Sequence, residues 1–445
     1  MMQWDKLLSA KRLGQENKEI SNVDEIRSQF QRDYDRIIFS SPFRRLQNKT
    51  QVFPLPGSVF VHNRLTHSLE VASVGRSLAN LVALELKNKS DIKHKSILDE
   101  LGSIVSAACL AHDLGNPPFG HAGEDAISRF FSQGKGLAIK EQVSANEWLD
   151  LTSFEGNANA LRLLTHQFNG RRKGGFALTY STLAALIKYP HGSDALSSGK
   201  KKYGYFQSEK ETFIAIANEL GLKKKSENPI CFARHPLVFL VEAADDICYE
   251  IMDIEDAHKL KILSTQKTFD LLLGFFDTTE DSSFYEQKEI VFKEVTDINE
   301  QVSYLRASVI SKLIKETADV FIAYHDQILE GEYNSNLIKD LQGNSKIAFE
   351  KCKNLAIKEI YNHPSVVKIE LSGFNVLGTL LDEFITALIR PDSEYSKKIL
   401  SIIPSQFNIE DQCIYKKTMA VVDFVSGMTD LYAVDLYKDI KGINL

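Results

Sequence analysis

Cysteine is scarce in this chain. Its 445 residues include five cysteines, which are Cys109, Cys231, Cys248, Cys352 and Cys413. Their number is odd, they are scattered, and no CxxC pair occurs. Small secreted domains instead carry even numbers of cysteines at regular spacings. The pattern therefore excludes a disulfide framework and predicts reduced thiols in an intracellular protein.

Long apolar runs are also missing. No stretch of about 18 uncharged apolar residues occurs, which is the length a membrane-spanning helix needs. The first residues, MMQWDKLLSAKRLGQENKE, carry charge throughout and contain no apolar core of the kind found in signal peptides. We therefore expect a protein of the cytoplasm without membrane contact.

An excess of positive charge is absent as well. Lysine and arginine total 53 against 59 aspartate and glutamate residues, which gives a formal net charge of −6. An acidic chain has no general attraction for nucleic acid, so any polyanion must meet a local basic site. A small anionic substrate fits this charge balance better than a long tract of DNA.

Strand-like alternation is rare, and its best candidate lies around residues 59–61. Helical periodicity dominates instead, with apolar stripes over 97–109, from Pro236 to Cys248, and from Arg64 onward. The first stripe stops at the Gly-Asn-Pro-Pro sequence 115–118, which cannot continue a helix. The sequence predicts an all-α protein.

No sharp linker divides the chain. We predict a helical core that carries a C-terminal helical extension. The expected divisions are an N-terminal helical segment over 1–60, the core over 61–260, and a C-terminal helical region packed on it over 261–445.

The dipeptide His112-Asp113 is the first candidate for chemistry. His112 continues the buried stripe that contains Leu101 and Ala108, so its side chain should point inward. A Pro/Gly-built loop follows and ends at His121, with Glu124 three residues on. A lone histidine on such a face is more often a satisfied core residue. A second histidine and two carboxylates within a dozen residues favour a site.

Asp245 is the second candidate, because it lies on the apolar stripe that begins at Pro236. A carboxylate on a buried face is costly unless it is paired or binds a metal. A buried salt bridge to Arg234 or Arg64 is the structural alternative. Tyr249 and Asp253 follow Asp245 at four and eight residues and extend the same face.

Arg64 and His67 are three residues apart and share a helix face. Arginine suits a bidentate phosphate contact, and histidine suits a metal. Together His67, His112, Asp113 and Asp245 form an imidazole–carboxylate set suited to Mg, Mn, Fe, Co or Zn. A second dipeptide, His325-Asp326, lacks a Pro/Gly loop and a companion histidine, and we expect it on a solvated helix face.

Six segments between about residues 35 and 435 carry a resemblance. They are SPFRRLQNKTQVF, HNRLTHSLEVA, AHDLGNPPFGHAGEDA, FEGNANALRLL, RHPLVFLVEAADDICYEIMDIEDA and DFVSGMTDLYA. They closely resemble the deoxyguanosinetriphosphate triphosphohydrolase (dGTPase) family of the HD superfamily. The His…His-Asp…Asp pattern marks only the superfamily, whereas the third and fifth segments are far more specific.

This resemblance implies an HD-domain core and a triphosphohydrolase. Such enzymes cleave a deoxynucleoside triphosphate between the sugar oxygen and the α-phosphate and release inorganic triphosphate. The implied catalytic residues are His121 and Glu124, and the implied metal ligands are His67, His112, Asp113 and Asp245. The implied substrate contacts are Arg64, Lys188 and Lys202 for phosphate, and Gln51, Tyr249 and Asp253 near the deoxyribose. The match at Lys202 is weaker, because the loop before it varies in length.

The resemblance also implies a divalent metal, with Mg or Mn favoured over Fe, Co or Zn, and a homo-oligomer, either a hexamer or a tetramer. The expected substrate is dGTP or another dNTP. A nucleotide effector or single-stranded DNA is a further candidate ligand.

Two alternatives remain. One is another HD enzyme, such as a nucleotide phosphodiesterase or a monophosphate phosphatase, which needs the same metal ligands. The other is a nucleotide-sensing or single-strand DNA-binding protein on the same scaffold. The sequence leaves open whether His121 acts as general acid or general base.

Overall fold

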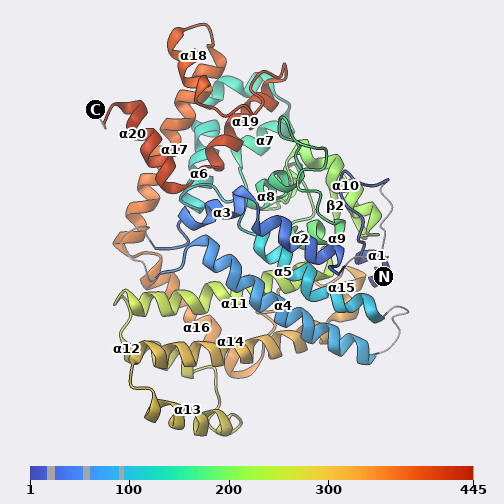
Figure 1. Ribbon diagram of the computed structural model, residues 1–445, viewed down its shortest axis with the longest axis vertical. Helices are drawn as coiled ribbons and strands as arrows, with labels where there is room; N and C mark the ends of the chain where they lie inside the picture. Colours follow the sequence, from blue (N-terminus) through green and yellow to red (C-terminus); the bar gives the residue numbers. More distant parts are fainter. Residues whose placement is uncertain (18–25, 54–60, 90–94, 444–445) are drawn as a thin grey trace.

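A computed structural model describes residues 1–17, 26–53, 61–89 and 95–443, and it is built almost entirely of helices (Figure 1). In this part of the chain the one sheet is an antiparallel hairpin of β1 (Lys224–Glu227) and β2 (Ile230–Phe232). The predicted all-α class is confirmed. The expected strand near 59–61 falls outside the described residues, apart from Val61, which is not in a strand.

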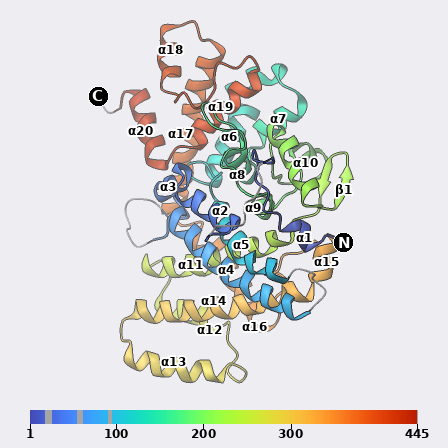
Figure 2. The same cartoon turned by 45° about the vertical axis from the view of Figure 1, so that its right-hand side comes forward.

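Five helices form the centre of the molecule. They are α2 (Gln29–Ile38), α4 (Arg64–Lys89), α5 (Leu101–Ala111), α11 (Pro236–Lys259) and α14 (Ile298–Ala323). Helix α4 packs against α5, α11 and α14, and α5 also packs against α2 and α11 (Figures 1 and 2). The helices that the sequence stripes predict therefore meet in one core.

Small side chains let α5 take the central position. Every residue of α5 except Ser103 is buried, and its sequence is LGSIVSAACLA. A Cβ atom on Gly75 of α4 would lie 2.6 Å from the Cys109 sulfur, so α4 and α5 approach too closely for any larger residue there. Leu69 falls within the apolar stripe that the sequence predicts from Arg64 onward, but it is 40% exposed.

The chain after α5 turns sharply into α6 (His121–Gln133). Phe119 and Gly120 adopt positive φ angles of 63° and 58°. A Cβ atom on Gly120 would lie 2.7 Å from an Arg64 guanidinium nitrogen, so glycine is required by both the backbone and the close approach. This turn brings His121 back toward the end of α5.

The remaining α-helices cover the core. They are α1 (Trp4–Leu7), α3 (Ser41–Arg45), α7 (Ala145–Thr152), α8 (Gly156–Thr165), α9 (Tyr180–Leu186), α10 (Lys210–Glu219), α12 (Thr265–Leu273), α13 (Ser282–Glu294), α15 (His325–Glu330), α16 (Gly343–Leu355), α17 (Pro364–Ile389), α18 (Glu394–Ser401), α19 (Ile414–Ser426) and α20 (Asp430–Lys441). Short 3-10 helices, including η4 (Ser193–Ser198), and the π-helical turn η6 (Ala356–Ile360) connect them. The divisions at 60 and 260 remain predictions.

Helix α17 is the one described helix that is long and apolar enough to cross a membrane. Half of its most apolar window is buried within the fold, where it packs against α6, α18, α19 and α20 (Figures 1 and 2). A core helix of a globular protein passes the same length and composition test, so this helix alone is weak evidence for a membrane span.

Candidate metal and phosphate site

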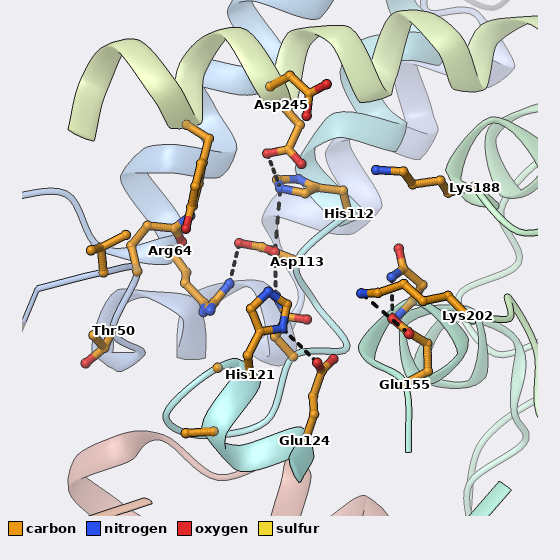
Figure 3. Close-up of a pocket in the computed structure, with 18 of the residues that line it drawn as sticks. Thr50, Arg64, His112, Asp113, His121, Glu124, Glu155, Lys188, Lys202 and Asp245 are labelled. Carbon is orange, nitrogen blue, oxygen red and sulfur yellow. Dashed lines mark hydrogen bonds and ion pairs between the residues drawn. The ribbon is translucent and has the colours of Figure 1, made fainter. Parts of the chain in front are cut away.

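Three helices bring the four predicted metal ligands together beside a cavity, which His112, Asp113 and Asp245 line (Figure 3). His67 comes from α4, His112 and Asp113 follow α5, and Asp245 lies on α11. His67 Nε2 and His112 Nε2 lie 3.1 Å and 3.4 Å from the same Asp245 oxygen, Oδ1. Ligand atoms of His67, His112 and Asp113 lie within 4.8 Å of one another. We refer to these four residues as the metal corner.

The chemistry of the metal corner fits a divalent cation. His112 Nδ1 donates a hydrogen bond to the Cys109 carbonyl oxygen at 2.6 Å, which fixes the ring and turns Nε2 toward the carboxylates. That buried Nε2 makes no hydrogen bond to any described residue. Burial opposes protonation of His112, but Asp113 and Asp245 outweigh it and raise the pKa of His112 to about 9. The corner therefore attracts positive charge.

The alternative for Asp245, a salt bridge to Arg234 or Arg64, does not occur among the described residues. Arg64 Nη1 pairs with Asp113 Oδ2 at 2.7 Å, and Arg234 pairs with Glu242 at 3.0 Å. Asp245 contacts the two histidines instead. These imidazole contacts outweigh the cost of burial and hold the pKa of Asp245 well below its usual range.

His121 and Glu124 form a pair on the first turn of α6. His121 Nδ1 lies 2.8 Å from Glu124 Oε2, and Glu124 Oε1 accepts a hydrogen bond from the Gly156 amide at 2.7 Å. The His121 side chain is 83% exposed and points into the cavity (Figure 3). The hydrogen bond to Glu124 raises the pKa of His121. The Gly156 amide thus holds Glu124 in place, and the exposed His121 ring is accessible to a ligand.

Three cationic side chains line the same cavity of about 550 Å³ (Figure 3). Arg64 is buried at the ion pair with Asp113. Lys188 Nζ lies 2.9 Å from Glu242 Oε1, and Lys202 Nζ lies 3.6 Å from Glu155 Oε2. An arginine beside a metal corner, together with lysines that line the same cavity, is suited to a phosphorylated ligand.

Two of the three predicted sugar contacts line the cavity, and the third does not. Gln51 and Tyr249 line the cavity, and the buried Gln51 Oε1 has no hydrogen-bond partner among the described residues. Asp253 does not line it. Its carboxylate accepts a hydrogen bond at 2.8 Å from the hydroxyl of Tyr361, which itself lines the cavity. Asp253 therefore lies behind the cavity wall.

Several lining residues were not predicted, and they include Asn116, Glu155, Glu242, Asp246 and Tyr361. The sequence could have indicated Asn116, because it lies in the Pro/Gly loop next to His112-Asp113. In the structure its side-chain amide donates a hydrogen bond to Asp113 Oδ1 at 2.5 Å. Tyr361 has no such signal, since it reaches the cavity from the end of η6, more than a hundred residues after Tyr249 in the sequence.

The second His-Asp dipeptide lies elsewhere, at the start of α15. Asp326 is exposed, with 83% of its side chain accessible, as predicted for a solvated face. The prediction is wrong for His325, whose side chain is only 18% exposed. The ring stacks beside Trp4, whose indole nitrogen donates to His325 Nε2 at 3.2 Å.

Two regions of the chain match known families. Residues 64–218 match the HD domain, and residues 340–439 match the Phosphohydrolase-associated domain. The first match contains His67, His112 and Asp113, and Asp245 follows it in the sequence. Fold, metal corner and match together define an HD-domain protein.

Relatives match over nearly the whole chain. A deoxyguanosinetriphosphate triphosphohydrolase-like protein of Synechocystis sp. is 39% identical over 100% of both chains, and one of Pseudomonas aeruginosa is 37% identical over 99% of both. The deoxyguanosinetriphosphate triphosphohydrolase of Yersinia enterocolitica is 30% identical over 93% of this chain and 94% of its own. The chain therefore belongs to the deoxyguanosinetriphosphate triphosphohydrolase family, and this prediction is confirmed.

Proposed function

We propose that this protein is a metal-dependent triphosphohydrolase that converts dGTP and other dNTPs to the deoxynucleoside and inorganic triphosphate. One observation carries the proposal. Three residues of the metal corner (His112, Asp113 and Asp245), the His121–Glu124 pair and the cations Arg64, Lys188 and Lys202 line one cavity of about 550 Å³, and the fourth residue of the corner, His67, contacts Asp245. The names of its full-length relatives supply the substrate class.

His67, His112, Asp113 and Asp245 would hold the cation, which we expect to be Mg or Mn rather than Fe, Co or Zn. Bound there, such a cation supplies neutralisation of phosphate charge and polarisation of a phosphoryl oxygen. Arg64 is held by Asp113 through Nη1 and lines the cavity, and Lys188 and Lys202 add charge on the opposite side.

His121 is our candidate for moving the proton. Hydrolysis adds water to the α-phosphorus, breaks its bond to the sugar oxygen, and places one proton on that oxygen. Glu124 fixes His121 through Nδ1, so Nε2 exchanges the proton with the reactants. The ring serves either as base toward water or as acid toward the sugar oxygen, and the present geometry suits both.

Gln51 and Tyr249 are our candidates for the deoxyribose contacts, and Asp253 would act through Tyr361. We also expect a homo-oligomer (a hexamer or a tetramer), a cytoplasmic location, and a nucleotide effector or single-stranded DNA as a further ligand. The non-catalytic alternative is disfavoured because all four ligands and the His121–Glu124 pair are present.

Product analysis tests this function. The metal-free protein is incubated with each of the four dNTPs, with and without Mn²⁺, and with and without a second dNTP. We expect deoxynucleoside and inorganic triphosphate, with dGTP among the substrates and only when metal is added. Release of pyrophosphate or of monophosphate would favour another HD enzyme and contradict the proposal.

A further inference from the structure

The motif DFVSGMTD, at residues 423–430, contains no metal ligand and no residue that lines the catalytic cavity. It spans the end of α19 and the start of α20, within the region that matches the Phosphohydrolase-associated domain. Nevertheless, its polar groups point at two loops that do line the cavity. The motif therefore contacts the walls of the catalytic cavity from outside and does not line the cavity itself.

Asp430 contacts both loops through its two carboxylate oxygens. Oδ2 accepts a hydrogen bond from the Thr50 amide at 2.8 Å, and Oδ1 accepts one from the Phe119 amide at 3.1 Å. Thr50 and Phe119 line the cavity, and Asp430 itself is only 6% exposed. Phe119 has a positive φ angle of 63°, which is unusual for a residue with a side chain, and it stands two positions before His121.

Ser426 provides a second connection. Its carbonyl oxygen accepts a hydrogen bond at 2.9 Å from the buried amine of Lys49, which also donates to the Asn116 carbonyl oxygen at 2.5 Å. The Asn116 amide in turn donates to Asp113 Oδ1. This chain of contacts runs from the motif to a residue of the metal corner.

The motif is anchored at its other end. Asp423 forms two parallel hydrogen bonds of 2.8 Å with Arg162 of α8, and both side chains are buried. Buried bidentate pairs of this kind hold a fixed geometry. Asp430 therefore projects from an immobile base toward the two loops.

We propose that Asp430 is a positioning residue that holds the Thr50 and Phe119 loops together and thereby sets the place of His121 relative to the metal corner. The motif at 423–430 thus supports the catalytic cavity without lining it. The kinetic part of this proposal rests on the proposed function, whereas its structural part does not.

Hydrogen exchange tests the structural part without turnover. In Asp430→Ala, the amides of residues 113–121 should exchange at least tenfold faster, while those of α5 and α11 keep their wild-type rates. Asp430→Asn retains one acceptor oxygen and should be intermediate. Asp435→Ala removes an exposed carboxylate of the same helix and should match wild type. Unchanged exchange in 113–121, or faster exchange throughout the chain, would overturn the proposal.

Kinetics test the consequence. Asp430→Ala should lower kcat at least tenfold with a smaller change in KM, and Asp430→Asn should recover part of that loss. An equal loss of folded protein and of activity, with kcat per folded chain unchanged, would overturn the positioning role. If the wild type hydrolyses no dNTP, the proposed function fails, and the exchange experiment still decides the role of Asp430.

A different observation concerns a second cavity, of about 950 Å³, which shares Lys188, Tyr189 and Lys202 with the catalytic cavity. No carboxylate from the described part of the chain lines it, although the chain as a whole is acidic. The cations that line it are Lys188, Lys200, Lys201, Lys202, Lys225 and Arg234. We call this second cavity the basic groove.

Much of this charge is not neutralised. Lys200 and Lys201 form no ion pair with any described residue, and Lys225 contacts only the Asn334 amide oxygen, at 3.4 Å. Burial and then the repulsion of Lys200, Lys223 and Arg234 lower the pKa of Lys225, and the attraction of Glu332 opposes this only in part. Uncompensated cations around a hollow indicate an anion with several charges.

We infer that the basic groove binds inorganic triphosphate, which reaches it from the catalytic cavity through the shared wall of Lys188 and Lys202. This inference rests on the proposed function, because triphosphate is its product. The groove continues the cationic side of the catalytic cavity toward Lys200 and Lys225 at the surface.

Calorimetric titration with tripolyphosphate in EDTA tests this inference on the full chain. We expect two bound anions in the wild type and one in the triple variant Lys200→Ala/Lys201→Ala/Lys225→Ala. The charge-matched control, Lys293→Ala/Lys351→Ala/Lys416→Ala, changes exposed lysines outside the groove and should still bind two. An equal number of bound anions in the wild type, the triple variant and the control would contradict triphosphate binding in the basic groove. A wild type that binds two anions but hydrolyses no dNTP contradicts the proposed function alone.

Discussion

The dipeptide His-Asp occurs twice in this chain, in two different settings. His112-Asp113 follows the almost completely buried helix α5 and meets His67 and Asp245 from two other helices. His325-Asp326 begins α15, where Asp326 is exposed and His325 contacts Trp4. The comparison indicates that a His-Asp dipeptide is suited to bind a metal only where other helices supply the remaining ligands.

The two settings also differ in electrostatic cost. Asp326 keeps its hydration, so its charge needs no partner. Asp113 is 7% exposed and stands beside a second carboxylate, Asp245, which makes a cation energetically favourable. Substitutions at the first dipeptide should therefore lower activity strongly, and substitutions at the second should leave it nearly unchanged.

The largest expected effect is that of His112→Ala. Loss of this ligand should lower dNTP turnover by at least about 10³-fold, as for removal of a catalytic group. Release of inorganic triphosphate is the readout. If the variant retains more than a tenth of wild-type turnover, the proposed difference in function between the two dipeptides is contradicted.

The second largest loss of activity is expected from His121→Ala. The second dipeptide, His325-Asp326, has no residue that corresponds to His121. Removing a general acid or base should lower kcat by roughly 10²–10⁴-fold while leaving metal binding intact. Steady-state kinetics together with metal analysis measure both properties. Simultaneous loss of metal would instead assign His121 to the metal corner.

A smaller effect is expected from Glu124→Gln, and it concerns pH. Glu124 raises the pKa of His121, so the wild-type ring keeps its proton to higher pH. A neutral amide removes this stabilisation, and the limb of the pH–rate profile that reports His121 should move to lower pH. An unmoved limb would mean that another group titrates.

Tyr249→Ala should affect selectivity more than rate. The Tyr249 ring lies edge-on to His67, with centroids 6.3 Å apart, and it lines the cavity where a sugar 2′-hydroxyl would meet a packed ring. The preference for dGTP over GTP, at most about 10²-fold for such a pocket, should largely disappear. If the preference survives intact, the discrimination lies elsewhere.

His325→Ala is the matched control for His112→Ala and should have the smallest effect. Because His325 contacts Trp4 and no cavity residue, we expect turnover within about twofold of wild type and a small loss of stability from the lost hydrogen bond. Kinetics and thermal unfolding measure the two quantities. A large kinetic loss would connect α15 to the site.

The sequence predicted the helical class and the residues that the structure gathers at the metal corner, because both follow from local periodicity and from recognisable motifs. Contacts between distant parts of the chain were not predictable in this way. Asp253 does extend the face of Asp245, but Tyr361 from η6 lies between it and the cavity. The bonds from Asp430 to Thr50 and Phe119 join residues more than three hundred positions apart.

Metal content measures the central difference between the two dipeptides most directly. Wild type, His112→Ala and His325→Ala are loaded with Mn²⁺, freed of unbound ion and analysed for metal per chain. We predict one bound ion in the wild type and in His325→Ala, and none in His112→Ala. Equal metal content in all three proteins would contradict the assignment of the metal to His67, His112, Asp113 and Asp245.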